Sequence, residues 1–166
     1  MSASGDYQEK NTDPGPWPDD LPPCLIHVDK DGRLWHLGAE MINLGINRLL
    51  LEHVDLDEKG RYVIDYQGQR CFIEVEDTLF VVARVDALGE EDGASPWLIT
   101  LNDGTTEQLD PTTLTQSPDN VLYARVKNGR FPARFLRPSY YQLAERVKEK
   151  DGHLVLTVAG RDYPVA

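Results

Sequence analysis

The sequence has little of what marks membrane proteins, disulfide frameworks and nucleic-acid binders. No run of its 166 residues approaches the roughly 18 consecutive apolar residues that cross a bilayer, and its first residues are polar and acidic, unlike a secretory signal. Only Cys24 and Cys71 are present, without metal-finger spacing, so we expect reduced thiols. The net charge of −11 opposes non-specific binding to DNA or anionic lipid. We therefore expect a cytoplasmic protein without a nucleic-acid or membrane partner.

Familiar catalytic signatures are also missing from the chain. It contains no Gly-rich phosphate loop, no nucleophile elbow, no Cys-x-x-Cys and no HExxH. We therefore assign no catalytic residue, no metal ligand and no cofactor, and a binding function is favoured over an enzymatic one.

What the sequence does contain is typical of a β-rich globular protein. It is 40% hydrophobic, which predicts a packed core, and its 13 glycines and 11 prolines favour many turns between short strands. Residues 1–22 are polar and interrupted by prolines, so we expect a disordered tail. Trp17 is the one residue of this tail that we expect to dock onto the folded part of the chain. Residues 86–120 hold eight acids and no base, whereas residues 121–150 hold eight bases against two acids.

Turn dipeptides and helical spacing predict a repeated order of hairpin, helix and hairpin. Helices are expected over Met41–Val54 and from Pro138 to about Val147. The four hairpin turns are Asp31-Gly32, Gln67-Gly68, Asn128-Gly129 and Ala159-Gly160. Further strands are expected at Leu79–Val85 and in a hairpin of Trp97–Leu101 with Thr105–Leu109. We therefore expect an α+β fold in which an internal duplication forms two mainly antiparallel β subdomains. The halves are expected at residues 23–85 and 86–166. The alternative is that the glycines of the hairpin turns match by coincidence, without a duplication.

The hairpin around Asn128-Gly129 gives the sharpest candidate site. A two-residue turn places Tyr123 opposite Arg134 and sorts the side chains into an apolar face and a basic face. The apolar face is Leu122, Ala124, Val126, Phe131, Ala133 and Phe135, and the basic face is Tyr123, Arg125, Lys127, Arg130 and Arg134. Arginines next to a tyrosine suit bidentate recognition of phosphate or carboxylate. The alternative is a solvated face that pairs with the acidic segment 86–120.

Two weaker constellations involve carboxylates and histidines. Glu74, Glu76 and Asp77 end the second hairpin and could bind a hard metal ion or serve acid–base chemistry, although an exposed polar face is favoured. A tight turn at Asp31-Gly32 would place His27 opposite His36 with Asp29 on the same face, which is too few ligands for zinc.

Three segments together resemble a known family. They are DGRLWHLG from Asp31, IEVEDTLF from Ile73 to Phe80, and YARVKNGRFPARFLRPSYYQLAE from Tyr123 to Glu145. They look like the proteobacterial domain-of-unknown-function family number 1285 over about residues 24–166, although Thr78-Leu79 stands where that family usually has Ala-Pro. The resemblance implies two related halves, a C-terminal half like a pleckstrin-homology domain, a nucleotide-like ligand between the halves, and a signalling role. Matching motif residues are Trp35, Glu76, Asp77, Arg125, Arg137, Tyr140 and Tyr141.

Three functions follow as hypotheses. The first is a module that binds a small anionic or nucleotide-like molecule, with Arg125, Arg134 and Arg137 on the anion and Tyr123 or Trp35 stacking. The second is an adaptor whose basic Arg/Tyr face docks an acidic protein. The third and weakest is a metal-dependent hydrolase built on the carboxylates.

Overall fold

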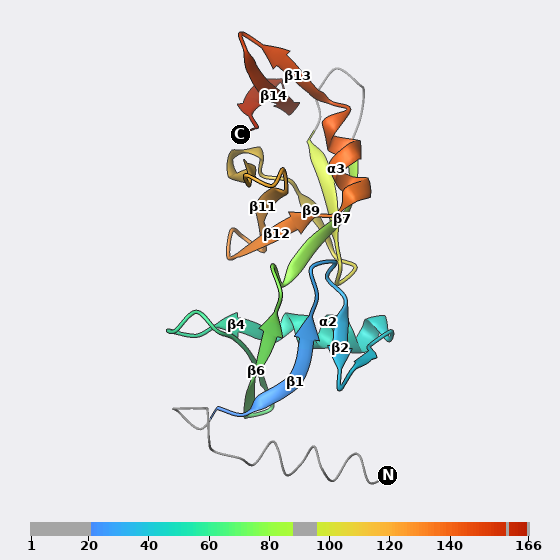
Figure 1. The fold of residues 1–166 in the computed structure, drawn as a ribbon, viewed down its shortest axis with the longest axis vertical. Helices are drawn as coiled ribbons and strands as arrows, with labels where there is room; N and C mark the ends of the chain where they lie inside the picture. Colours follow the sequence, from blue (N-terminus) through green and yellow to red (C-terminus); the bar gives the residue numbers. More distant parts are fainter. Residues whose placement is uncertain (1–20, 88–95, 159, 166) are drawn as a thin grey trace. The chain divides into compact units, whose positions relative to one another are not determined.

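The computed structural model describes residues 21–87, 96–158 and 160–165, and the remainder, including Trp17 and Glu90 to Asp92, lies outside the described residues. The chain divides into two compact units (Figure 1). The first comprises residues 1–29 and 34–76, and the second comprises residues 30–33 and 77–166. The sequence placed the boundary after residue 85, but the strand predicted at Leu79–Val85 belongs to the second unit.

The described residues of the first unit form a six-stranded sheet and one helix. In chain order these elements are β1 (Pro23–Val28), β2 (Leu34–His36), β3 (Ala39–Glu40), α2 (Leu44–Glu52), β4 (Val54–Leu56), β5 (Tyr62–Tyr66) and β6 (Gln69–Val75). The strand order is β3-β2-β1-β6-β5-β4, with β1 parallel to β6 and every other pair antiparallel. The predicted turn at Gln67-Gly68 is confirmed, because Tyr66 pairs with Gln69.

Helix α2 is shorter than predicted, and the residues that it buries are not the ones that the helical spacing indicated. The Asn43 side chain accepts a hydrogen bond from the Ile46 amide at 3.1 Å, which fixes the helix start beyond Met41. Asn47 and Leu51 are its buried residues, and the side-chain Nδ2 of Asn47 donates to the Met41 carbonyl at 2.7 Å. The apolar residues that gave the helical spacing lie largely on the surface instead. Exposed among them are Ile42, Ile46 and Leu49, and Leu44 beside them is exposed as well.

The second unit contains another six-stranded sheet, a helix and a separate three-stranded sheet. In chain order these are β7 (Phe80–Ala87), β8 (Trp97–Leu101), β9 (Thr106–Gln108), the 3-10 turn η1 (Pro111–Thr113), β10 (Thr115–Gln116), β11 (Leu122–Val126), β12 (Phe131–Phe135), α3 (Arg137–Ala144), β13 (Val147–Lys150), β14 (His153–Val158) and β15 (Arg161–Pro164). The larger sheet runs β10-β11-β12-β7-β8-β9, with β7 and β12 parallel.

The second helix ends earlier than predicted. The chain continues from α3 into strand β13, where Val147 pairs with Leu156 of β14. Asp151 and Gly152 both have positive φ angles and form the turn that joins β13 to β14. Val147 fitted the helical spacing, but it begins the strand that leads to the Asp151-Gly152 turn.

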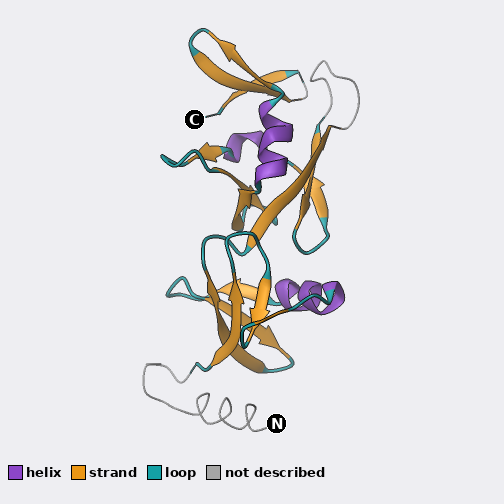
Figure 2. Cartoon of the chain, turned by 45° about the vertical axis from the view of Figure 1, so that its right-hand side comes forward, coloured by secondary structure: helices purple, strands orange, loops and turns teal. Residues whose placement is uncertain are grey.

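The two six-stranded sheets share one topology. When the strands of each sheet are numbered one to six in chain order, both sheets read 3-2-1-6-5-4, with first and last strands parallel at the centre. The connection between the third and fourth strands carries α2 in one unit and η1 in the other. The α+β class and the duplicated β subdomains are thus confirmed, and strands dominate in Figure 2. The topological repeat is β1–β6 with β7–β12, whereas the sequence aligned the first repeat with the segment from β11 to β15.

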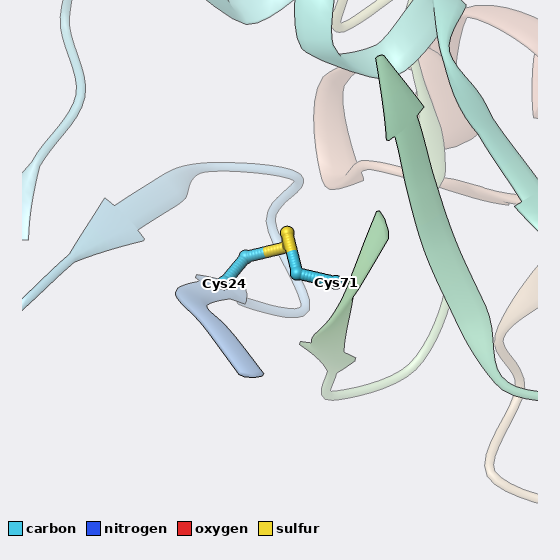
Figure 3. The surroundings of a disulfide bond; sticks show 2 residues. All are labelled: Cys24 and Cys71. Carbon is cyan, nitrogen blue, oxygen red and sulfur yellow. A yellow bond between two sulfur atoms is a disulfide. The ribbon is translucent and has the colours of Figure 1, made fainter. Parts of the chain in front are cut away.

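The prediction of free thiols is wrong. Cys24 on β1 and Cys71 on β6 form a disulfide, with Cα atoms 5.1 Å apart (Figure 3). Neighbouring strands bring together two cysteines that are 47 positions apart, which spacing along the chain cannot show. Within the described residues, no helix is both long and apolar enough to cross a bilayer.

Candidate functional site

The hairpin β11–β12 has the register that the sequence predicts. Tyr123 pairs with Arg134, and Val126 pairs with Phe131. All six residues of the predicted apolar face are buried, so Tyr123, Arg125 and Arg134 lie on the opposite face of the two strands. Lys127 and Arg130 belong to the turn between the strands, and the Lys127 ammonium lies over the Phe80 ring. Local turn chemistry and strict alternation were enough to place these side chains.

Asp77 joins the tyrosine and the arginine of this pair. Its Oδ2 accepts a hydrogen bond from the Tyr123 hydroxyl at 2.8 Å and one from Arg134 Nη1 at 2.9 Å. Burial, then the hydrogen bond to the Asp77 carboxylate, raise the pKa of Tyr123. The same carboxylate raises the pKa of Arg134. The guanidinium is therefore a fixed, permanently charged group with further N–H donors beyond the one that Asp77 uses.

A cleft of about 600 Å³ lies beside Arg134 in the second unit. The first residues of α3 form one side of it, where Arg137, Tyr140 and Tyr141 follow directly on β12. Its lining residues are Lys30, Asp31, Asp119, Asn120, Val121, Leu122, Arg134, Phe135, Leu136, Arg137, Tyr140 and Tyr141. Four of the predicted ligand residues, Arg134, Arg137, Tyr140 and Tyr141, therefore share one cleft.

Helix α3 is anchored so that these side chains have defined positions. Ser139 is fully buried, and its hydroxyl donates to the Val82 carbonyl on β7 at 2.6 Å. Leu136 precedes the helix without a side-chain cap, and Pro138 occupies its second position, where no intrahelical N–H is lost. The rings of Tyr140 and Tyr141 meet edge to face with centroids 5.7 Å apart.

The charge of the cleft is mixed. Lys30, Arg134 and Arg137 contribute positive charge, and Asp31 and Asp119 contribute negative charge. Arg137 is exposed, and its guanidinium forms no hydrogen bond or ion pair within the described part of the chain. It is the cation of the cleft best placed to meet an incoming anion.

The remaining predicted ligand residues lie elsewhere. Arg125 donates to the Gly129 carbonyl at 3.1 Å and lines a different cleft with Glu107 and Asp110. Trp35 and Glu76 belong to the first unit, where the Trp35 indole donates to Asp29 at 2.9 Å. The expectation of a ligand between the halves stays a prediction.

Pairing of the basic face with the acidic segment occurs at one position among the described residues. Lys127 Nζ contacts Asp103 Oδ2 at 2.8 Å, and the Lys127 amide donates to the Glu107 carboxylate. Burial opposes ionisation of Asp103, but hydrogen bonds from Lys127 and Thr105 hold its pKa below the ordinary value. The alternative of a solvated face that pairs with acids thus describes Lys127, whereas Arg134 pairs with Asp77.

The candidate metal constellations do not assemble. His27 pairs with Trp35 and not with His36, because the turn after Val28 contains more than two residues and shifts the register by one. Glu74 and Glu76 lie in the first unit, and Asp77, in the second, is engaged with Arg134. The described residues contain no group of three or more His, Cys, Asp or Glu side chains able to hold a metal ion.

Sequence reasoning missed part of the lining of the cleft. Lys30 and Asp31 come from the β1–β2 turn, about a hundred positions before Arg134, and no local pattern links them. Asn120 has a positive φ of 63° in the turn before β11. The dipeptide Asp119-Asn120 is a turn signal that could have drawn attention to this edge.

Comparisons with known proteins support the fold. No protein-family model matches the chain, and no curated protein has a similar sequence. A crystal structure of a DUF1285 family protein from Silicibacter pomeroyi DSS-3 is similar, with a TM-score of 0.72 and 20% identity over 86% of this chain and 80% of that one. A DUF1285 family protein from Shewanella baltica OS155 gives a TM-score of 0.59 and 16% identity over 73% of this chain and 91% of that one. The chain thus resembles DUF1285 proteins in fold.

Proposed function

We propose that this chain is a non-enzymatic binding protein whose second-unit cleft takes a small anionic, nucleotide-like molecule. The observation that carries the proposal is the convergence of Arg134, Arg137, Tyr140 and Tyr141 around one cleft of about 600 Å³. That volume falls within the usual range for small-molecule sites. A signalling role, a cytoplasmic location and a pleckstrin-homology-like second half stay expectations that accompany this proposal.

The chemistry of the cleft supports an anion over a cation. Arg134 is held by Asp77 and therefore loses little side-chain entropy when a ligand binds. Arg137 is exposed at the start of α3 and supplies a fork of donors that matches phosphate or carboxylate. The tyrosine rings offer apolar faces on which a planar base could stack. These groups would recognise the anion and the ring of a nucleotide together.

The test compares the loss of an arginine that lines the cleft with the loss of one that lies outside it. Arg137→Gln removes a cation from the cleft, whereas Arg125→Gln removes one from the same unit outside it. AMP, adenosine and inorganic phosphate serve as probes in thermal-shift and calorimetric titrations of the full chain. A ligand that binds the native state raises the unfolding temperature by mass action.

We expect AMP to stabilise the protein more than adenosine or phosphate. Arg137→Gln should weaken AMP binding by about tenfold, because a charge-assisted hydrogen bond contributes about 1.5 kcal/mol or more. Arg125→Gln should change the affinity less than about twofold. The proposal fails if no probe stabilises the protein at millimolar concentration, or if both variants bind AMP equally.

The basic residues outside the cleft support the adaptor as a second candidate. Arg125 and Arg130 are exposed on the outer face of β11–β12 and its turn, where an acidic protein could dock. In this case association with an acidic peptide would weaken as salt rises, and Arg125→Gln would reduce it while Arg137→Gln would not. The same pair of variants thus separates the two functions.

A further inference from the structure

A second hollow, of about 660 Å³, lies on the sheet of the first unit. It has a different chemical character from the cleft beside Arg134, because the charged side chains that line it are two carboxylates and its one basic group is a histidine. Its lining residues are Pro23, Leu25, Ile26, His27, Asp29, Trp35, Leu37, Gly38, Phe72 and Glu74.

Strand alternation places the key side chains of this hollow in one row. Ile26 and Val28 of β1 are buried, so His27 between them points to the opposite face of the sheet. Its neighbour on β2 is Trp35, and its neighbour on β6 is Glu74. An indole, an imidazole and a carboxylate thus lie side by side on three adjacent strands.

A break in the sheet opens the hollow next to this row. The pairing of β1 with β6 is interrupted between Pro23 and His27, and Leu25 there has a φ of 62°. Such irregularities redirect side chains and end strand pairing locally. The Cys24–Cys71 disulfide joins β1 to β6 next to this interruption.

The groups around the hollow match a cation that carries an apolar body. Trp35 donates its indole N–H to Asp29 at 2.9 Å, which orients the ring beside a carboxylate. Glu74 is exposed, and its carboxylate forms no hydrogen bond or ion pair with any residue that the structure describes. Phe72, Leu25 and Leu37 supply apolar surface. An ammonium or guanidinium gains both from carboxylates and from an aromatic face.

The charge of the first unit points in the same direction. Its described residues, 21–29 and 34–76, hold nine acids and four bases. The resulting negative potential attracts cations and repels the anions that the second unit would bind.

We propose that this hollow is a binding site for an organic cation, namely a protonated amine or guanidinium attached to an apolar group. Trp35 and Phe72 contact the apolar body, and Asp29 and Glu74 neutralise the charge. This site is separate from the cleft beside Arg134 and does not depend on the function proposed for that cleft.

Three probes of one shape and different charge test the proposal. Phenethylamine is the cation, 2-phenylethanol is the neutral counterpart, and phenylacetate is the anion. Each is titrated into the ¹⁵N-labelled full chain, and the indole N–H signal of Trp35, assigned with Trp35→Phe, is followed by NMR. The signals of Trp17 and Trp97 serve as internal references.

We expect phenethylamine to shift the Trp35 signal saturably and to bind at least about tenfold more tightly than phenylacetate. Glu74→Gln should weaken phenethylamine binding by about five- to tenfold. Glu58→Gln removes an equal charge from the same unit outside the hollow and should change it less than about twofold. A capped peptide containing one arginine provides a second source of the same cationic chemistry. If it binds more tightly than phenethylamine, the site belongs to a protein partner; if less tightly, to a small amine.

The proposal is overturned if the three phenyl probes bind equally, if the Trp35 signal does not respond, or if both Glu variants reduce binding to the same extent. Equal binding would mean that the hollow selects only apolar surface. Equal effects of the two variants would mean that net charge, and not Glu74, attracts the amine.

Discussion

Replacing Gly32 by alanine should destabilise the second unit more than a comparable change elsewhere. Gly32 has a φ of +77°, and a Cβ added there would lie 2.5 Å from Val81 Cγ2 and 2.9 Å from Asn102 Nδ2. The side-chain Nδ2 of Asn102 donates to the carbonyls of Gly32 and Leu79, and its Oδ1 accepts from the backbone N–H of Val81. Movement of Asn102 away from a new methyl group would therefore disturb three hydrogen bonds.

The magnitude follows from two contributions. A left-handed conformation costs an L-residue about 1–2 kcal/mol. Overpacking against Val81, which is fully buried, adds about 1–3 kcal/mol. We expect Gly32→Ala to lower the free energy of unfolding by about 2–5 kcal/mol. Gly104→Ala is the matched control, because Gly104 has a φ of +82° in the same unit and a Cβ added there would meet no heavy atom within 4 Å.

Urea unfolding provides the assay. Trp97 is buried in the second unit, so its fluorescence reports on that unit once Trp17 and Trp35 are changed to Phe. In this background Gly104→Ala should cost only the conformational term, about 1–2 kcal/mol. Equal losses for the two glycine variants would refute the reasoning, because they would mean that contacts with Val81 and Asn102 contribute nothing.

Two further predictions concern a covalent and an ionic link. Changing both Cys24 and Cys71 to Ser should lower the free energy of unfolding by about 4 kcal/mol, since the disulfide closes a loop with a sequence separation of 47. Urea unfolding midpoints, measured with and without reductant, check this prediction. A shift of the midpoint by reductant that persists in the Ser variant would contradict it. Lys127→Met should cost about 3 kcal/mol at pH 7, because it leaves the Asp103 carboxylate, 1% exposed, without its cation. The pKa of Asp103 is lowered below 3.8, so its contribution is present above that pH and is lost as pH falls through the lower folded value. The difference between wild type and Lys127→Met should therefore shrink below about pH 4, and a difference unchanged at pH 2 would oppose this assignment.

Local signals were the part of the fold that the sequence could predict. Asn128-Gly129 sets the register of β11–β12 because the two strands are joined by that turn alone, and alternation then places Tyr123 beside Arg134. The same reasoning gave a strand register at Asp31-Gly32 that was wrong by one residue. There the strands end at Val28 and begin again at Leu34, so a longer turn changes the partner of each side chain.

Contacts between distant segments could not be predicted from such signals. Nothing near Cys24 indicates that β1 lies beside β6, and nothing near Arg134 indicates that Asp31 lines the same cleft. Arg125 and Arg134 share a strand face, yet they line different clefts. Residue type and alternation identified the basic face, but only the position of α3 against β7 showed that Arg134 shares a cleft with Tyr140.

The parallel pairing of first and last strands has a consequence for synthesis of the chain. In each sheet the central ladder joins the strand made earliest to the strand made latest, β1 to β6 and β7 to β12. Neither sheet can complete its centre until all six of its strands have left the ribosome, because the closing partner is the last to emerge. Each repeat should therefore fold as a unit, late and in one step, and the first repeat has its closing strand available some sixty residues before the second.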